Sequence, residues 1–375
     1  MMSTPNRTFQ SLFSPEHIIL IGASERPYSL GERVLSSLLR SGFQGRITPV
    51  NPKHKTIGGI KTRSHISRVN EATDLAVIVT PPATITGILR TCEKKQIQHI
   101  AIIQDWDNLS IENYQIIKSA IESANQPNNI ITCTTAGIQN FSSAFNAGIY
   151  HSSNTGHTAV ISTNASTSGF IFSTLKTIDS GVSKHISLHS TLCPPDLTAD
   201  ILNFLTYDAN TRLAILEYDE LFLKPQLFSA IRQFTQKKKL ILHCSHFINT
   251  EERAVLNNLA SEFNFLFSQT PEALTAAIHA LINDKKPATK LTVLSNSPCS
   301  WLQNETQQSI DFDFPSATSR PSEKLQGFIG SNPSTLSYLD KSENLMQQPQ
   351  TEALLCLINP TADHNENDIA QWLPL

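Results

Sequence analysis

A loop rich in glycine and hydroxyl side chains follows the first apolar run in this sequence. The run His17–Ile21 has strand length and ends in Gly22, and a segment with helical periodicity begins at Gly31. At such a strand-to-helix turn, a parallel sheet presents backbone N–H groups and a helix N-terminus to an anion. The glycines would allow close backbone approach, and Ser24 and Ser29 could donate hydroxyl hydrogen bonds. These residues predict a phosphate-binding loop, although their spacing is not the G-x-G-x-x-G of dinucleotide sites.

The residues after the second expected strand indicate which nucleotide this loop would hold. An NAD site needs an Asp or Glu there, to accept a hydrogen bond from the ribose 2′-hydroxyl. This chain instead has Asn51, Pro52 and Lys53, followed by His54 and Lys55. Cations suit a ribose that carries its own phosphate, as in coenzyme A (CoA) or NADP. A single lysine in a loop is more often a solvated residue than a ligand-binding one. Together with the glycine loop, however, these residues favour a nucleotide site, and we prefer CoA to NADP as its ligand.

Apolar runs of strand length alternate with amphipathic stretches of helix length over most of the chain. In the first unit, strands are expected at His17–Ile21, Arg46–Val50, Leu75–Thr80, His99–Gln104 and Asn129–Cys133, and helices at Gly31–Ser41, Ile85–Lys95 and Ile111–Ser123. After a polar stretch, Asn146–Thr155, a second unit repeats the rhythm from Thr158–Ser162 to a helix at Glu272–Ile282. Such alternation predicts an α/β fold with a parallel, doubly wound sheet.

The overall composition excludes several classes of protein. Charged residues make up 16% and hydrophobic residues 39% of the chain, and the net charge of −3 provides no basic surface for nucleic acid. The six cysteines form no C-x-x-C pair, so neither a structural zinc site nor a disulfide framework is expected. No apolar run approaches the ~20 residues of a membrane span. We therefore expect a cytoplasmic protein without metal, membrane or nucleic-acid binding.

Several motifs of the first unit occur together in one continuous stretch. They are Leu12–Pro15, Ile21–Ser24, Pro27, Ser29, Gly31, Gly42–Phe43, Pro49–Lys53 and Asp74–Pro82. They resemble the CoA-binding domain of the NDP-forming acyl-CoA synthetases. This superfamily includes the succinyl-CoA synthetase alpha chain and the synthetase-like N-terminal part of bacterial protein lysine acetyltransferases. The resemblance implies that CoA lies across Gly22, Ala23, Ser24, Pro27, Ser29, Gly31, Asn51, Pro52, Lys53, Thr80, Pro81 and Pro82.

The second unit carries weaker motifs, at Ala159–Ser162 and Asp208–Leu216. They resemble the flavodoxin-like, succinyl-CoA synthetase-like domain of the same superfamily. We therefore expect a Rossmann-type CoA-binding domain over residues 8–145 and a flavodoxin-like domain over 156–286. The strand-like stretches Lys290–Ser295 and Leu354–Ile358 lie in a region rich in Ser, Pro, Asn and Gln. Residues 287–375 are expected to form a partial third α/β domain, eroded or truncated.

The second unit departs from the family where active relatives hold a phosphoryl group. The Gln-Ser-Gly turn of those relatives is replaced by Thr163, Asn164 and Ala165, and their Gly-Asn turn by His189 and Ser190. A Cβ in place of glycine blocks close backbone approach and a positive φ. The phosphate cradle is therefore expected to be lost.

The fourth strand of the first unit also ends differently from the family. Asp105, Trp106 and Asp107 stand where relatives have a small Ser-Ala-Gly-Phe turn. Two carboxylates near each other could be taken for an acid/base pair. We interpret them as solvated residues near a helix N-terminus, where negative charge is favourable.

Active synthetases carry a phosphate on a histidine in a Ser-His-Thr-Gly loop, and this chain has Ser245-His246 without the glycine. If the loops are aligned, His246 is the carrier and Glu220, at the family's glutamate position, orients it. If the strand Lys239–Cys244 is aligned instead, the catalytic loop has been lost. We favour the strand alignment because loops vary more readily than strands.

These features lead to a CoA- or acyl-CoA-binding relative of the synthetases that has lost phosphoryl transfer. The alternative is an active alpha-type subunit, an NDP-forming acyl-CoA ligase that works with a separate ATP-grasp chain. The resemblance implies a CoA species as the ligand and an ATP-grasp or acetyltransferase chain as a protein partner. It is also compatible with an oligomeric protein. An NAD(P)-dependent oxidoreductase is disfavoured by Asn51 and by the lack of a catalytic Tyr-Lys or His constellation.

Overall fold

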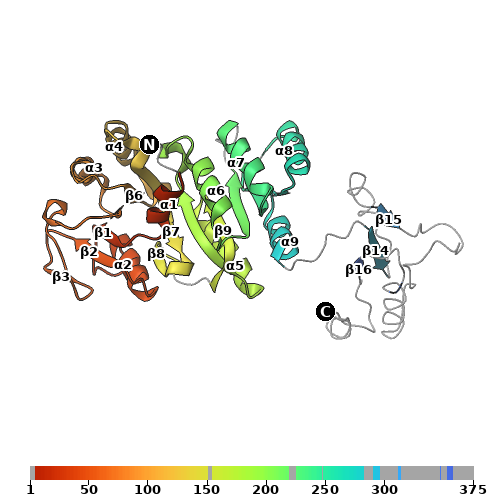
Figure 1. Cartoon of the computed structure of the whole chain (residues 1–375), viewed down its shortest axis with the longest axis horizontal. Helices are drawn as coiled ribbons and strands as arrows, with labels where there is room; N and C mark the ends of the chain where they lie inside the picture. Colours follow the sequence, from red (N-terminus) through yellow and green to blue (C-terminus); the bar gives the residue numbers. More distant parts are fainter. Residues whose placement is uncertain are drawn as a thin grey trace, which may run out of the picture. The chain divides into compact units, whose positions relative to one another are not determined.

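The computed structural model describes residues 5–150, 154–218, 225–246, 248–282, 290–295, 311–313, 347 and 353–357. The chain divides into two compact units, Met1–Asp284 and Lys285–Leu375. The first unit contains a continuous sheet of eleven strands with helices packed on both faces (Figure 1). The expected doubly wound α/β architecture is thereby confirmed.

The first half of this sheet is parallel and has the spatial order β2-β1-β5-β6-β7. Its strands are β1 (His17–Ile21), β2 (Arg46–Val50), β5 (Leu75–Ile78), β6 (His99–Ile103) and β7 (Ile130–Asn140). The connecting helices are α2 (Leu30–Arg40), α3 (Ile85–Lys94) and α4 (Ile111–Glu122), and a small hairpin of β3 (Thr56–Ile57) and β4 (Ile60–Lys61) follows β2. The strand order reverses between β1 and β5, and such a switch point opens a ligand crevice at the carboxyl ends of the strands.

The second half repeats this order as β10-β9-β11-β12-β13. Its strands are β9 (Asn154–Ser162), β10 (Gly181–Leu188), β11 (Leu213–Tyr218), β12 (Lys239–Cys244) and β13 (Leu266–Ser268). Its helices are α5 (Ala165–Thr177), α6 (Leu197–Tyr207), α7 (Pro225–Thr235), α8 (Thr250–Phe263) and α9 (Pro271–Ile282). A second switch point therefore lies between β9 and β11.

The two halves join where β7 pairs with β10 in antiparallel fashion. Cys133 of β7 is the register partner of Ile103, the last residue of β6, and also of Leu188, the last residue of β10. Strands β6 and β10 therefore run toward Cys133 from opposite directions, and both end beside it. Division of this unit into separate domains at residues 8–145 and 156–286 stays a prediction.

Strand β7 is longer than expected because buried polar side chains interrupt its apolar pattern. It runs on to Asn140, and Thr134 within it donates a 2.6 Å hydrogen bond to Ser187 of β10. Beyond it, β8 (Phe145–Ala147) and the start of β9 take up the two ends of Asn146–Thr155, the stretch that the sequence indicated as a polar separator. Paired polar side chains inside a sheet give a sequence pattern that resembles a loop.

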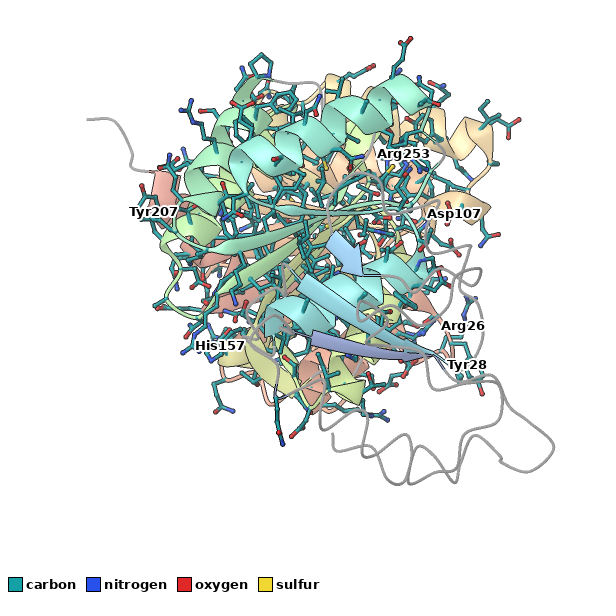
Figure 2. The ribbon with its side chains drawn as sticks, turned by 90° about the vertical axis from the view of Figure 1, so that its right-hand side faces the viewer. Arg26, Tyr28, Asp107, His157, Tyr207 and Arg253 are labelled. Carbon is teal, nitrogen blue, oxygen red and sulfur yellow. The ribbon has the colours of Figure 1, made fainter. Side chains whose placement is uncertain are left out.

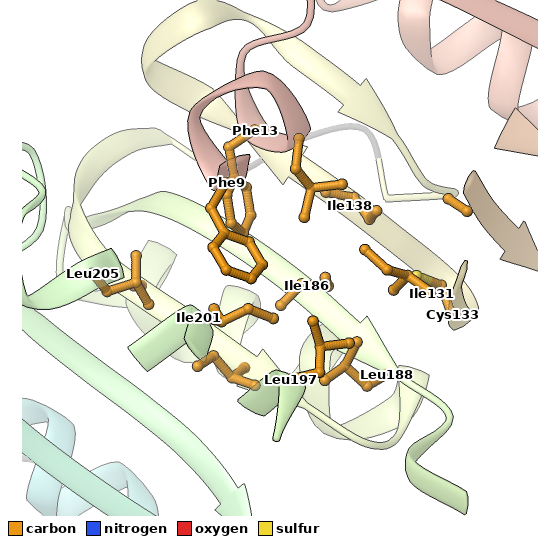
Figure 3. Packing of buried hydrophobic residues seen from close by; sticks show 14 of the residues in the cluster. Phe9, Phe13, Ile131, Cys133, Ile138, Ile186, Leu188, Leu197, Ile201 and Leu205 are labelled. Carbon is orange, nitrogen blue, oxygen red and sulfur yellow. The ribbon is translucent and has the colours of Figure 1, made fainter. Parts of the chain in front are cut away.

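A single hydrophobic cluster crosses the junction between the halves. Helix α1 (Pro5–Phe13), which the sequence did not predict, places Phe9, Leu12 and Phe13 in this cluster, together with residues of β7, β10 and α6 (Figure 3). The ring of Phe13 stacks on Phe204 of α6 with centroids 5.7 Å apart. Two further clusters lie under α3 and α4 and under α5 and α9. The shared cluster makes the two halves one packed body.

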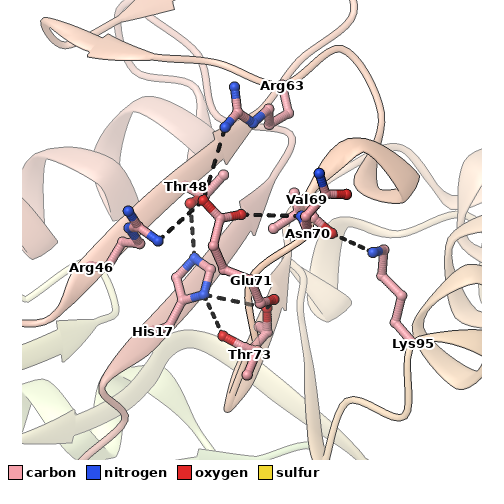
Figure 4. A network of polar contacts seen from close by, with 10 residues as sticks. His17, Arg46, Thr48, Arg63, Val69, Asn70, Glu71, Thr73 and Lys95 are labelled. Atoms are coloured by element: carbon pink, nitrogen blue, oxygen red, sulfur yellow. Dashed lines mark hydrogen bonds and ion pairs between the residues drawn. The ribbon is translucent and has the colours of Figure 1, made fainter.

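Titratable residues at the amino ends of β1 and β2 form a structural network (Figure 4). His17 is buried, with its Nδ1 2.6 Å from the Ala72 carbonyl and its Nε2 2.8 Å from the Thr48 hydroxyl. Beside it, Glu71 accepts a 3.1 Å charged hydrogen bond from Arg46. This network lies at the amino ends of the parallel strands, opposite to their carboxyl ends, where a ligand would bind. We therefore interpret it as holding the strands in place.

The second compact unit contains three described strands, β14 (Lys290–Ser295), β15 (Asp311–Asp313) and β16 (Ala353–Leu357). They form a parallel sheet in the order β15-β14-β16. The sequence predicted β14 and β16 but not β15. Within the described part of the chain, no helix has the length and apolar character needed to cross a membrane.

Candidate functional site

The glycine loop lies at the first switch point, where β1 ends beside β5. Gly22 has a φ of +95°, and a Cβ there would lie 2.8 Å from the methyl group of Thr80. A Cβ on Gly31, in the first turn of α2, would lie only 2.1 Å from the carbonyl oxygen of Gly22. Only glycine permits this packing, which brings the N-terminus of α2 against the end of β1. The N-terminus of α2 therefore lies at the end of β1, and the binding of an anion there stays a prediction.

The hydroxyl groups of the loop are used inside it. Ser29 is the N-cap of α2: its oxygen accepts from the backbone N–H of Glu32, and its own proton is donated to the Arg26 carbonyl at 2.7 Å. Ser24 accepts from the backbone N–H of Arg26 at 3.0 Å. In this conformation Ser29 shapes the loop instead of donating to a ligand, which differs from the role expected for it.

Asn51 connects the end of β2 to the glycine loop. Its amide donates to the Ala23 carbonyl at 2.8 Å, and its oxygen accepts from the backbone N–H of Lys53 at 2.8 Å. The side chain of Asn51 is therefore a positioning group. Lys53 itself is exposed. Among the residues that the resemblance assigns to CoA, it is the one with a charged side chain.

The Thr80-Pro81-Pro82 turn closes the other side of the switch point, and a buried residue that the sequence did not single out holds it. The side-chain amide of Gln104, at the end of β6, donates to the Thr80 carbonyl at 2.8 Å. Thr84 donates its hydroxyl hydrogen bonds to Thr80 and to the Pro81 carbonyl. The only signal in the sequence is a polar residue directly after an apolar strand.

An aromatic group covers the carboxyl ends of β6 and β10. The indole N–H of Trp106 donates to the Cys133 carbonyl at 2.8 Å, and the indole ring lies 4.3 Å from the His189 ring between centroids. Burial lowers the pKa of His189, so its ring is neutral near pH 7. Asp105 and Asp107 are both exposed, as expected for solvated residues. This group brings a side chain of the first half against one of the second.

At the second switch point, a carboxylate of the protein itself occupies the N-terminus of α5. Glu217, at the end of β11, is 3% exposed. One of its oxygens accepts from the backbone N–H groups of Thr163 and Asn164 at 2.6 and 3.1 Å, and the other accepts from the Thr167 hydroxyl at 2.8 Å. These two N–H groups belong to the N-cap Asn164 and the residue before it, directly ahead of α5. The sequence did not reveal this contact.

The expected catalytic pair is not brought together within the described residues. His246 is exposed on the short loop between β12 and α8, and Glu220 lies outside the described residues. His243 is buried in β12, where its Nδ1 lies 3.1 Å from the Ser268 hydroxyl. Burial lowers the pKa of His243, and the nearby charge of Glu217 opposes this shift. His243 therefore has a structural environment within the sheet.

Comparison with known proteins identifies the first half of the chain. Residues 16–135 match the family model of the CoA binding domain. Subunit alpha of ADP-forming acetate–CoA ligase II from Pyrococcus furiosus is 29% identical over 233 residues, which cover 61% of this chain and 50% of that protein. The ADP-forming acetate–CoA ligase of Methanocaldococcus jannaschii is 28% identical over 230 residues, covering 61% of this chain and 32% of the ligase. The chain is homologous to the NDP-forming acyl-CoA synthetases.

The fold of this synthetase homologue agrees with that relationship. The apo structure of the dinucleotide-forming acetyl-coenzyme A synthetase 1 from Ca. Korarchaeum cryptofilum superposes with a TM-score of 0.70 at 19% identity, over 97% of this chain and 85% of that one. The chain spans half or less of the length of the two curated ligases described above. The expected superfamily, its CoA-binding domain and coenzyme A as the ligand class are thereby supported.

Proposed function

We propose that this protein binds CoA or acyl-CoA at the first switch point and no longer transfers a phosphoryl group at the second. Binding is supported by the Gly22 and Gly31 contacts, which place the N-terminus of α2 at the carboxyl end of β1. Lys53 adds an exposed cation beside this N-terminus, where the 3′-phosphate of CoA would be attracted. The match of residues 16–135 to the CoA binding domain supports the same ligand.

Loss of phosphoryl transfer is supported chiefly by Glu217. Its buried carboxylate already accepts from the two N–H groups directly ahead of α5, so a phosphate bound there would meet a negative charge. The N-cap of α5 is Asn164, and Ala165 follows where a glycine would permit closer approach. The short β12–α8 loop carrying His246 agrees with the strand alignment, in which the catalytic loop has been lost.

Calorimetry with CoA, acetyl-CoA, NAD and NADP tests the ligand. We expect heat of binding with the two CoA species, and its absence with both would contradict the proposal. The variant Lys53→Met should weaken binding of CoA but leave that of 3′-dephospho-CoA nearly unchanged, because only CoA carries the 3′-phosphate. Lys61→Met, an exposed lysine of β4, is the matched control for loss of one positive charge.

A second candidate function is an active alpha-type subunit that works with a separate ATP-grasp chain. It is favoured by the similarity to subunits alpha of two Pyrococcus furiosus ligases, at 29% and 27% identity. This function requires acid-labile phosphate on His246 when acyl-CoA, phosphate, nucleotide and the partner chain are supplied. Labelling that disappears in His246→Ala would establish it, and unchanged activity in that variant would remove it.

A further inference from the structure

The phosphate-binding loop contains an aromatic residue in a conformation that normally requires glycine. Tyr28 has a φ of +63°. It is the third residue of a tight turn, Arg26-Pro27-Tyr28-Ser29, which is closed by a 3.2 Å hydrogen bond from the Ser29 N–H to the Arg26 carbonyl. A positive φ at this position of a turn is the usual reason for glycine or asparagine there. A large side chain with a Cβ therefore holds a strained backbone.

The side chain of Tyr28 gains no packing in return for this strain. It is 93% exposed, and the other exposed large apolar side chains of the described residues are at most 74% exposed. Figure 2 shows Tyr28 and Arg26 projecting together from the rim of the first half. The turn is held firmly, because Ser29 donates both its N–H and its hydroxyl to the Arg26 carbonyl. The ring is thus presented to solvent by a fixed turn.

We propose that the Tyr28 ring stacks on the adenine of CoA, an inference that rests on the proposed function. The adenine is the only aromatic group of CoA, and stacking requires an exposed aromatic face. Tyr28 lies four residues after Ser24 and directly before the N-cap Ser29, beside the N-terminus that would face the pyrophosphate. An aromatic platform next to a phosphate site matches the order of groups in an adenine nucleotide. Tyr28 is therefore a specificity-determining residue for the adenosine part of the ligand.

The test compares CoA with 4′-phosphopantetheine, which lacks the adenosine, by calorimetry on the full chain. In Tyr28→Gly and Tyr28→Asn, which both tolerate a positive φ, we expect binding of CoA to weaken about tenfold or more. Binding of 4′-phosphopantetheine should stay the same, and Tyr28→Phe should bind CoA like the wild type. Because the glycine variant relieves strain, its melting temperature should not fall, which separates a lost contact from a damaged fold.

Each other outcome has a defined meaning. Wild-type affinity for CoA in both Tyr28→Gly and Tyr28→Asn overturns the stacking inference but leaves the proposed function intact. An equal loss for CoA and 4′-phosphopantetheine also overturns it, because the defect then lies in the loop and not in the adenine contact. If the wild type itself binds no CoA species, the proposed function fails.

Discussion

The N–H groups at the two switch points face different partners, and single residues cause the difference. At the N-terminus of α2, Gly31 removes the side chain that would separate the helix from β1. At the N-terminus of α5, the carboxylate of Glu217 fills the corresponding position with a negative charge. We therefore expect the first N-terminus to attract an anionic ligand, whereas at the second a carboxylate of the protein takes that position.

The first prediction concerns Gly31. In Gly31→Ala the added Cβ would lie 2.1 Å from the Gly22 carbonyl, so the start of α2 must move away from β1. We expect a loss of stability of about 1–3 kcal/mol and loss of CoA binding, measured by urea unfolding and calorimetry. Gly87→Ala in α3 is the control. Nothing lies within 4 Å of the Cβ that this substitution adds, so it should increase the free energy of unfolding by about 0.5–1 kcal/mol. Full CoA affinity in Gly31→Ala would contradict the assigned geometry.

The second prediction concerns Glu217. Glu217→Ala leaves the N–H groups of Thr163 and Asn164 without their acceptor, which should cost about 1–3 kcal/mol in chloride buffer. Inorganic phosphate should then raise the melting temperature of the variant more than that of the wild type at equal ionic strength. Glu262→Ala, at an exposed position of α8, should respond like the wild type. Equal phosphate responses of wild type and Glu217→Ala would show that Glu217 does not occupy an anion position.

Some of these residue roles could be predicted from the sequence and others could not. Gly22 and Gly31 stand at the ends of a strand and a helix, so their neighbours along the chain indicate their role. Asn51 and Glu217 act on backbone groups 28 and 53–54 residues away. Such long-range hydrogen bonds leave no local pattern in the sequence. For this reason the sequence suggested a ligand contact for Asn51 and did not reveal that its amide donates to the Ala23 carbonyl.

At the scale of elements, apolar periodicity predicted most of the sheet. The ranges of β1, β2, β12 and β14 agree with the expected ones, because each is a short apolar run bounded by a turn. Helix α1 was not predicted, since Pro5–Phe13 follows a polar start and its apolar side chains pack against distant elements such as β7 and α6. Strand β8 and the second part of β7 were also not predicted, because they pair polar side chains inside the sheet.

The third prediction concerns the contact between β10 and α5. His185 of β10 is fully buried beside Ser168 of α5, its Nδ1 has no hydrogen-bond partner, and burial lowers its pKa to about 3. The unfolded chain takes up this proton near pH 6.5 and the folded chain only near 3, so folding stability falls as the pH drops below 6.5. Between pH 7 and pH 5 this residue should account for a loss of about 2 kcal/mol.

Urea unfolding at the two pH values measures this effect. His185→Gln removes the titrating group and should make the loss of stability between pH 7 and pH 5 smaller by that amount. His279→Gln, at a half-buried histidine in the last turn of α9, is the matched control. If His185→Gln keeps the full wild-type pH dependence, the ring of His185 is not buried in its neutral form.

At the scale of the whole molecule, the cluster under α1 and the β7–β10 pairing join the two halves in one unit. The fourth prediction follows from this continuity. Saturation with CoA at about 100 times its Kd should stabilise the unit by about 2.7 kcal/mol. The slowest-exchanging amides of β11 and β12 should then exchange about 100-fold more slowly, although they lie outside the CoA-binding half. Protection confined to β1, β2, β5 and β6 would show that the halves unfold separately.

The shared register partner of β6 and β10 has a consequence for how this protein can change during evolution. Cys133 fixes where both halves end along the strand direction. One residue inserted within Ile130–Cys133, where β7 pairs with β6 in regular register, would slide one half by about 3.3 Å past the other and turn the following side chains to the wrong face. Surface loops can lengthen or shorten without this penalty. Among homologues, the length of β7 should therefore vary less than that of any connecting loop.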